Sequence, residues 1–155
     1  MTTWAAFAAA EPELADFSAR RLRSELPSYL ATVQGGGTPR IHPVTPIFTD
    51  QGLYLFMEPT SPKGRDLRER PWFALHSGVP DHKGTGGEVW VTGTARPDDD
   101  PGVRAAVTAA AGYDPPARYV VFELQPTEVR CFGYGDVALP EHPRWRERAA
   151  NPSTA

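Results

Sequence analysis

The stretch at residues 53–71, "LYLFMEPTSPKGRDLRERP", sets an apolar strand directly against a short basic helix. "LYLFM" has the composition of a buried strand, and a helix is predicted over residues 61–70. Ser61 is a good helix N-cap, and Pro62 occupies the first helical position, where a missing N–H costs nothing. The stretch therefore predicts a strand, a tight turn and a helix, and the flanking sequence decides what fold surrounds them.

Sequence on both sides of this stretch predicts strands that are joined mainly by short turns. The predicted strands are "SYLATVQ", "RIHPVTPIF", "LYLFM", "WFALHSGV", "EVWVTGTARP" and "RYVVFELQPTEVRCFGYG", the last being a strand pair or one long bent strand. Further helices are predicted over residues 3–24, with a break near Glu11 and Pro12, and over the Ala-rich residues 98–112. A parallel sheet would need helices between most strands, and the sequence does not predict them. We therefore predict a small antiparallel barrel, closed or partly closed.

Length and composition limit the remaining possibilities. The 155 residues predict one domain over residues 1–137, followed by an arm or tail at 138–155. A net charge of −3 gives no overall attraction to nucleic acid, and one cysteine excludes an internal disulfide. The four histidines lack metal-ligand spacing, so no metal site is predicted. The run "AAFAAA" is too short to cross a membrane, and we expect a cytoplasmic protein without membrane or nucleic-acid partners.

The start of the predicted helix has the features of a phosphate cradle. A capping box would place Glu or Gln at position 64, whereas Gly64 leaves room for a ligand near the backbone. Lys63 and Arg65 add positive charge to the free N–H groups of the first turn. The same residues also fit a capped surface helix with solvated basic side chains, and this segment alone favours that simpler interpretation.

Two other segments leave alternatives open. Pro43 and Pro46 must lie at a sheet edge or at an interruption of the strand ladder, which either frees backbone groups for a flat ligand or only bends the core. Trp145, flanked by Arg144 and Arg146, either folds over a cofactor pocket or belongs to a disordered tail. No Gly-x-Ser-x-Gly motif supports nucleophilic hydrolysis.

Roughly residues 28–97, from "YLATVQGGGTPRIHPVTPIFTDQG" through "LYLFMEPTSPKGRDLRERPWFALH" to "GGEVWVTGTARP", resemble the pyridoxamine 5'-phosphate oxidase-like, flavin-binding split-barrel family. The resemblance implies a mainly β (α+β) fold, a six-stranded antiparallel split β-barrel with a few short helices. It also implies a homodimer, with flavin mononucleotide (FMN) at the interface. The resemblance reverses the preference at Lys63 in favour of the phosphate cradle.

The resemblance also implies which residues contact the cofactor. Residues 41–45 correspond to the strand that lines the flavin ring, and Ser61 and Lys63 correspond to the phosphate contacts. Glu88 corresponds to a position that supplies a polar side chain. With Gly64 and Arg65 of the cradle added, the cofactor-binding residues that we expect are Ile41, His42, Pro43, Val44, Thr45, Phe56, Met57, Ser61, Lys63, Gly64, Arg65 and Glu88.

The activity that the resemblance implies is FMN-dependent oxidoreduction of an unknown small molecule, with hydride transfer at the flavin ring. His76, Glu88 and the loop at 80–87 are the only acid or base candidates, and the catalytic residues are not identified. Pro62 stands where the vitamin B6 oxidase has a basic residue, and that oxidase's C-terminal substrate-phosphate pattern is not recognisable. Alternatives are a reductase that uses the deazaflavin coenzyme F-420, or a flavin- or haem-binding module without turnover.

Overall fold

The computed structural model describes residues 1–148 and contains four helices and eight strands in that part of the chain. The helices are α1 (Trp4–Ala10), α2 (Pro12–Ser24), α3 (Pro62–Glu69) and α4 (Pro101–Ala111). The strands are β1 (Ser28–Val33), β2 (Pro39–Val44), β3 (Ile47–Phe48), β4 (Leu53–Met57), β5 (Trp72–His76), β6 (Glu88–Asp98), β7 (Val120–Phe132) and β8 (Arg144–Arg146). Across residues 1–148, none of the helices combines the length and the apolar character needed to span a membrane.

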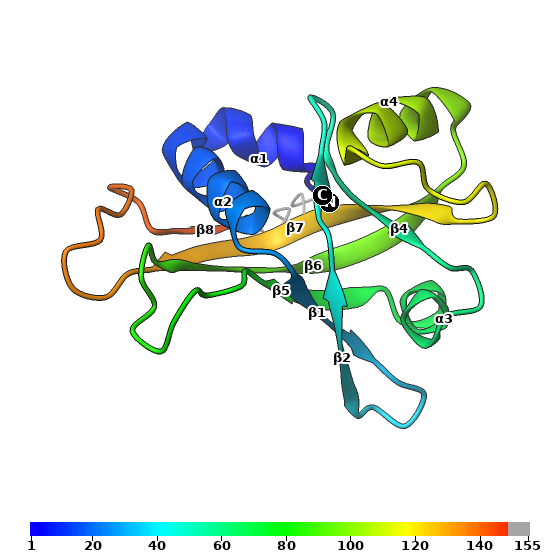
Figure 1. Ribbon diagram of the computed structural model, residues 1–155, viewed down its shortest axis with the longest axis horizontal. Coiled ribbons are helices and arrows are strands. Elements are labelled where there is room, and N and C mark those ends of the chain that lie inside the picture. The colour runs from blue at the N-terminus through cyan, green and yellow to red at the C-terminus, as the bar shows by residue number, and fades with distance from the viewer. Residues whose placement is uncertain (149–155) are drawn as a thin grey trace, which may run out of the picture.

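All strands pair antiparallel in one sheet of order β2-β1-β5-β6-β7-β4-β3, with β8 added beside β7 (Figure 1). β2 and β3 lie at opposite ends of this order, yet they follow one another in the chain. The bent segment 39–48 therefore joins the two edges. Counted as one bent strand, it makes a ring of six strands, which confirms the predicted split-barrel class; β8 is additional and was not predicted.

Prolines explain the bend. Pro43 lies in β2, which pairs with β1 alone, and Pro46 lies in the gap between β2 and β3. Because proline has no N–H to donate to a ladder, it is tolerated at an edge or an interruption and not inside a central strand. The prediction for both prolines is confirmed.

The last predicted strand is a single long one. β7 pairs with β6 along its whole length, while its other side pairs with β4 near the start and with β8 near the end. A bulge in the β6–β7 ladder falls at Thr92 and Gly93. A side chain at Gly93 would collide with the carbonyl oxygen of Gln125, so this close approach requires glycine.

The main core lies between the sheet and the helix pair α1–α2, which covers one face of the sheet in Figure 1. The helices break at Glu11, as predicted, because Pro12 starts the second helix. The two helices bury one apolar face against the sheet, which includes Trp4, Phe7, Leu14, Phe17 and Leu22. A smaller core under α4 consists of Ile47, Tyr54, Val107 and Val121.

The C-terminal segment up to residue 148 forms a strand and is not the predicted disordered tail. Trp145 lies in β8 and packs its ring 4.9 Å from that of Phe7, so it packs against the core of the domain; its role over a cofactor pocket stays a prediction. Arg144 and Arg146 bind Glu128 of β7 at 2.7 and 2.8 Å. Pairing and ion pairs therefore extend the domain past residue 137, and residues 149–155 of the expected arm lie outside the described residues.

Candidate functional site

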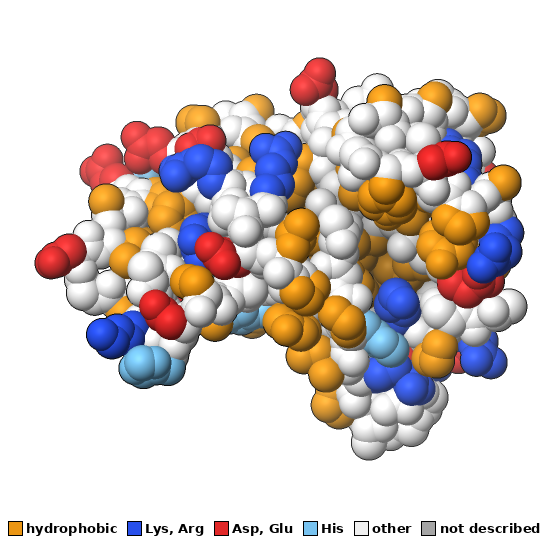
Figure 2. Space-filling model, in the orientation of Figure 1, with side chains coloured by type: hydrophobic (Ala, Val, Ile, Leu, Met, Phe, Trp, Pro, Cys, Tyr) orange, Lys and Arg blue, Asp and Glu red, His pale blue; other side chains and the backbone are white. Residues whose placement is uncertain are grey.

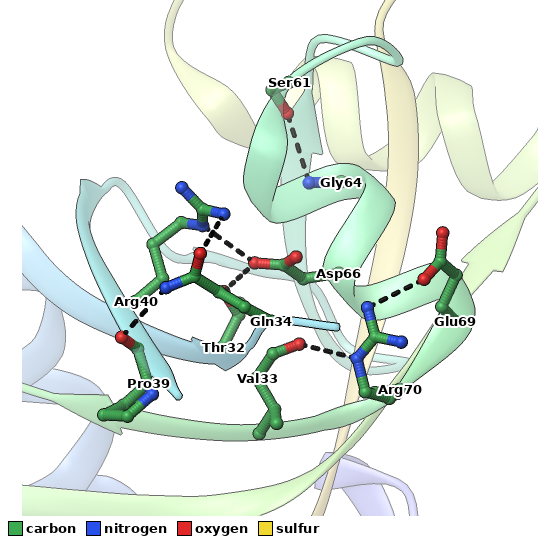
Figure 3. Close-up of polar contacts among 10 residues, drawn as sticks. All are labelled: Thr32, Val33, Gln34, Pro39, Arg40, Ser61, Gly64, Asp66, Glu69 and Arg70. Atoms are coloured by element: carbon green, nitrogen blue, oxygen red, sulfur yellow. Dashed lines mark hydrogen bonds and ion pairs between the residues drawn. The ribbon is translucent and has the colours of Figure 1, made fainter. Parts of the chain in front are cut away.

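Helix α3 is fixed to the sheet through the carboxylate of Asp66. This carboxylate is buried and accepts hydrogen bonds from Thr32 Oγ1 of β1 at 2.8 Å and from Arg40 Nε of β2 at 3.0 Å (Figure 3). Burial raises the pKa of Asp66, but the bonds from Thr32 and Arg40 outweigh burial and hold the pKa below its usual value. Asp66 is therefore ionised, and it anchors α3 beside β2.

Two further arginine contacts complete the anchor (Figure 3). Arg40 Nη2 donates to Gln34 Oε1 at 2.6 Å, which holds the β1–β2 turn against the same side chain. At the end of α3, Arg70 Nε donates to the carbonyl oxygen of Val33 at 2.9 Å. The middle of α3, at Asp66, and its C-terminal cap, at Arg70, are thus held against β1 and β2, which fixes the helix beside these strands.

This anchor brings His42 and Lys63 to the same region. Along β2, Arg40, His42 and Val44 alternate with exposed residues and share the half-buried face. Lys63 precedes Asp66 by one helical turn and therefore lies on the same face of α3. We call Arg40, His42 and Lys63 the β2–α3 cluster. Figure 2 shows basic side chains and a histidine gathered over these two elements.

The β2–α3 cluster has a surplus of positive charge, because Asp66 pairs with Arg40 and leaves Lys63 unbalanced. Burial lowers the pKa of His42, the charges of Lys63 and Arg40 lower it further, and Asp66 opposes them only in part. Its imidazole is therefore neutral at neutral pH. Nε2 of His42 is buried and has no hydrogen-bond partner among residues 1–148, and Lys63 has no ion pair within the same range. An anionic group with several acceptor oxygens would satisfy both.

The helix N-terminus offers fewer free donors than the sequence implied. Ser61 Oγ accepts the N–H of Gly64 at 3.2 Å, and the N–H of Arg65 bonds to the carbonyl oxygen of Ser61 at 3.1 Å. Pro62 has no N–H, so in the described chain the N–H of Lys63 is the one first-turn donor that remains. The hydroxyl hydrogen of Ser61 is also free to donate.

The expectation that Gly64 leaves room for a ligand is wrong. A Cβ at this position would lie 3.1 Å from Ser61 Oγ and 3.2 Å from the carbonyl oxygen of Glu58. The space beside Gly64 is therefore filled by the preceding turn and not left for a ligand. The side chain of Arg65 is also separate from that of Lys63, because residues two apart on a helix point in different directions and Arg65 is exposed.

The two β4 side chains expected to contact the cofactor pack against the two cores of the domain. Met57 is 1% exposed in the main core, so only its backbone is available, and that backbone pairs with Val120. Phe56 is half-buried under α4, where Arg104 lies 5.3 Å and Tyr113 6.4 Å from its ring. Neither side chain points into the β2–α3 cluster.

The residues of β2 that alternate with His42 lie on the opposite side of the sheet. Ile41 and Pro43 of β2 are exposed, as is Thr45 just after the strand, and Ile41 is 67% exposed. The strand register places Pro43 opposite Tyr29, and Tyr29 opposite His76. Large apolar side chains are exposed on this surface, which we call the outer face: Tyr29, Ile41, Trp72 and Phe132.

Glu88 lies on β6, separated from β2 by β1 and β5. Its Oε1 accepts a hydrogen bond from Tyr134 Oη at 3.3 Å and lies 3.9 Å from His76 Nε2. The charge of Glu88 raises the pKa of Tyr134. The loop at 80–87 closes a cavity of about 260 Å³ beside this group. Sequence reasoning missed Tyr134, since an aromatic residue after a strand carries no distinctive signal.

Solved structures resemble this fold at low sequence identity. A heme-binding protein from Mycobacterium smegmatis is 23% identical, with a TM-score of 0.63 over 79% of this chain and 54% of that protein. A NimC/NimA family protein from Clostridium acetobutylicum is 21% identical, with a TM-score of 0.62 over 74% and 84%. The heme storage protein HutZ from Vibrio cholerae is 18% identical, with a TM-score of 0.57 over 81% and 94%. At these identities the likeness shows the fold alone, and this chain spans about half of the Mycobacterium protein.

Sequence comparison assigns the family. No curated protein sequence matches the chain significantly. The profile of the pyridoxamine 5'-phosphate oxidase family matches residues 12–132, which run from the start of α2 to the end of β7 and contain the β2–α3 cluster. Since this match covers most of the chain and agrees with the six-stranded split-barrel ring, the chain belongs to the pyridoxamine 5'-phosphate oxidase family.

Proposed function

We propose that the protein binds FMN and catalyses oxidoreduction of a small molecule. The observation that supports this most is the β2–α3 cluster, where Lys63 and the buried Nε2 of His42 have no partner in the described chain. The family match includes this region, and a dianionic phosphate would satisfy both groups. When bound, the flavin supplies hydride transfer, while the protein supplies binding and orientation.

The residues of the cluster have distinct roles in this proposal. Lys63 neutralises phosphate charge with its ammonium group and donates its backbone N–H, and Ser61 donates its hydroxyl. Pro62 contributes no donor, so the site has fewer contacts than a full helix N-terminus would offer. Asp66 takes no part in binding; it keeps Arg40 and α3 in place.

The outer face supports a homodimer. Tyr29, Ile41 and Trp72 are 42%, 67% and 60% exposed, and an apolar surface of this kind marks an interaction site. A second copy of the chain is the simplest cover, because closed two-fold pairing buries the same patch on both subunits. In such a dimer, Glu88 would reach the cofactor across the interface, since within one chain it is separated from the β2–α3 cluster.

Proton transfer is assigned to the group around Glu88. His76 and Tyr134 both face this carboxylate and line the end of the sheet beside the loop at 80–87. A substrate bound there would meet an imidazole, a carboxylate and a phenol that can hold or release a proton. The substrate itself is a small molecule of unassigned class.

An absorbance spectrum of the freshly purified protein tests the cofactor. FMN, a deazaflavin and haem have separate visible bands, so one spectrum distinguishes the proposal from both alternatives. We expect flavin bands, or their recovery when apoprotein is incubated with FMN. Deazaflavin bands, or failure to retain either flavin after incubation, would contradict the proposal.

Haem binding is a second candidate, favoured by the same histidine. The unpaired Nε2 of His42 is a nitrogen of the kind that ligates haem iron, and two of the similar structures are a heme-binding and a heme storage protein. This candidate predicts a Soret band on addition of hemin, and loss of that band in His42→Ala. FMN binding that survives in His42→Ala with no Soret band in either protein would exclude it.

Sedimentation tests the dimer. At micromolar concentration we expect about twice the chain mass of 16.9 kDa. Replacing Trp72 with Glu on the outer face should shift the protein to monomer, because a charge would be buried without a partner. Arg65→Glu on the exposed side of α3 is the control and should remain dimeric. A wild-type monomer would contradict this part of the proposal.

A further inference from the structure

A second group outside the β2–α3 cluster has unsatisfied hydrogen-bonding capacity. Arg21 of α2 has a side chain that is 13% exposed, and its Nε and Nη2 are buried without a hydrogen-bond partner in the described chain. The nearest carboxylate belongs to Glu25 and lies 3.6 Å from the other nitrogen, Nη1. Nε and Nη2 share one edge of the guanidinium, the edge that binds a carboxylate side-on through two parallel bonds.

Other arginines of this chain show what that edge binds. Arg96 places Nε and Nη2 at 2.7 and 2.6 Å from Glu123 Oε2. Arg146 places the same two nitrogens at 3.3 and 2.8 Å from Glu128 Oε2. In both cases the edge is used by a carboxylate. The edge of Arg21 belongs to a side chain that is 13% exposed, against 54% for Arg96 and 64% for Arg146, and it has no hydrogen-bond partner among residues 1–148.

A cavity adjoins this guanidinium. Its volume is about 550 Å³, within the range of small-molecule sites. The lining residues are Phe17, Arg20, Arg21, Arg23, Ser24 and Gly86. Phe17, Arg20, Arg21 and Ser24 recur at helical spacing, so α2 presents them on one face. Figure 2 shows Lys and Arg side chains gathered over α2, and the cavity is accordingly positive.

The two neighbouring arginines are engaged with other side chains, whereas the Nε and Nη2 edge of Arg21 is not. Arg20 Nε binds Asp16 at 2.9 Å, and the guanidinium of Arg23 lies 4.6 Å from the centre of the Phe48 ring. Both contribute positive charge to the cavity while their own contacts hold them at its rim. Arg21 is therefore the residue whose main binding edge is left for a ligand.

We propose that this cavity binds a small organic carboxylate. The Nε and Nη2 edge of Arg21 takes the carboxylate, and Phe17 packs against the apolar body of the ligand. Gly86 has φ +80° and approaches so closely that a Cβ there would lie 2.6 Å from Arg21 Nη1. The 80–87 loop thus approaches the guanidinium closely. The edge formed by Nε and Nη2 is buried in this structure, so the proposal requires the terminal torsions of Arg21 to rotate when the carboxylate binds. The site is separate from the proposed flavin site and does not depend on it.

A titration of ¹⁵N-labelled protein with benzoate, followed by NMR, tests this site, with uncharged benzamide as the matched ligand. We expect benzoate to shift the Arg21 Nε–Hε signal and the amides of residues 20–24 and Gly86, whereas benzamide leaves them in place. Arg21→Lys keeps the charge but removes the side-on edge, so benzoate should bind at least about 10-fold more weakly. Arg20→Lys, in the same cavity, should change the affinity far less.

Several outcomes would overturn the proposal. Equal shifts with benzoate and benzamide would show that the carboxylate is not recognised, and equal losses in Arg21→Lys and Arg20→Lys would show that general charge suffices. If inorganic phosphate gave the same shifts at lower concentration, the occupant would be an oxyanion and not an organic acid. FMN affinity should be unchanged in Arg21→Lys, so failure here and failure of the flavin proposal are distinguishable.

Discussion

Two buried carboxylates organise two arginine-containing regions of this molecule, and only one region leaves a lysine and a buried imidazole nitrogen without a partner in the described chain. At the C-terminal end, the carboxylate of Glu128 accepts three arginines within 3.3 Å: Arg130, Arg144 and Arg146. At the helix α3, Asp66 holds Thr32 and Arg40, while His42 and Lys63 beside it have no partner in the described chain. The first region is closed on itself and structural. The second is pre-positioned and cationic, which is what an anion-binding site requires.

The largest loss of stability should come from removing Glu128, the carboxylate at the centre of the C-terminal arginine cluster. Glu128→Ala removes the carboxylate that Arg130, Arg144 and Arg146 share; because these arginines are 35%, 44% and 64% exposed, water replaces part of each contact, and the total loss should be about 3 kcal/mol. Urea unfolding should show this loss, while FMN affinity should stay within about two-fold if the folded fraction is accounted for. Glu141→Ala is the control, since Glu141 is exposed, and should change stability by less than about 0.5 kcal/mol. A loss below about 1 kcal/mol in Glu128→Ala would mean that β8 is not held by this network.

Removing the anchor of α3 should lower stability by a smaller amount, and it should also lower FMN affinity. Asp66→Ala removes the acceptor of Thr32 and Arg40, and lost hydrogen bonds to a charged group cost about 1.5–3 kcal/mol. Because the anchor also positions Lys63, FMN affinity should fall together with stability. Thr32→Val keeps the shape and removes one bond, so it should cost about 1 kcal/mol. Unchanged FMN affinity in a folded Asp66→Ala protein would show that α3 needs no anchor to bind phosphate.

Acidification should affect the same two carboxylates. The pKa of Glu128 is held below 4.5 because its bonds to Arg146 and Arg144 outweigh the opposing effect of burial, and Asp66 is depressed in the same way. A carboxyl with a depressed folded-state pKa contributes stability that is fully present above its unfolded pKa and is lost as pH falls through the folded value. Unfolding free energy should therefore decline below about pH 4.5, and less steeply in Glu128→Gln. If the unfolding free energy of wild type and of Glu128→Gln fell equally steeply with pH, the proposed role of the Glu128 network would be contradicted.

The smallest effect is electrostatic and concerns His42. Lys63 lowers the pKa of His42, so Lys63→Ala should raise it, as measured by NMR titration of the ring signals. Arg65→Ala is the matched control and should leave that pKa in place, since Arg65 points away from the cluster. If Lys63→Ala and Arg65→Ala raised the pKa of His42 equally, Lys63 and Arg65 would have to lie equally close to His42, which contradicts the cluster.

Local sequence signals predicted the strand-and-helix framework well. The break between α1 and α2 follows from Pro12, and the bend between β2 and β3 follows from Pro46. These features depend on neighbours in sequence. β8 could not be predicted, because its pairing with β7 and the packing of Trp145 on Phe7 join parts of the chain that are far apart.

The candidate site was predictable only in part. The position of Lys63 after a Ser-Pro start can be read from local rules, and it places the cation at the first turn. The roles of Thr32 and Arg40 depend on strand register, which brings them opposite each other and against Asp66. Gly64 was misread, because its close contact with the carbonyl oxygen of Glu58 is a property of the folded turn.

The central claim is that Lys63 and the start of α3 hold a phosphate group, and paired titrations with FMN and riboflavin test it most directly. Losing one charge-assisted contact costs about 1.5–3 kcal/mol, so Lys63→Ala should weaken FMN roughly 10- to 150-fold. Riboflavin has no phosphate and should bind almost equally to wild type and Lys63→Ala, and Arg65→Ala should resemble wild type with both ligands. If Lys63→Ala weakens both ligands equally, or neither, the β2–α3 cluster does not bind phosphate.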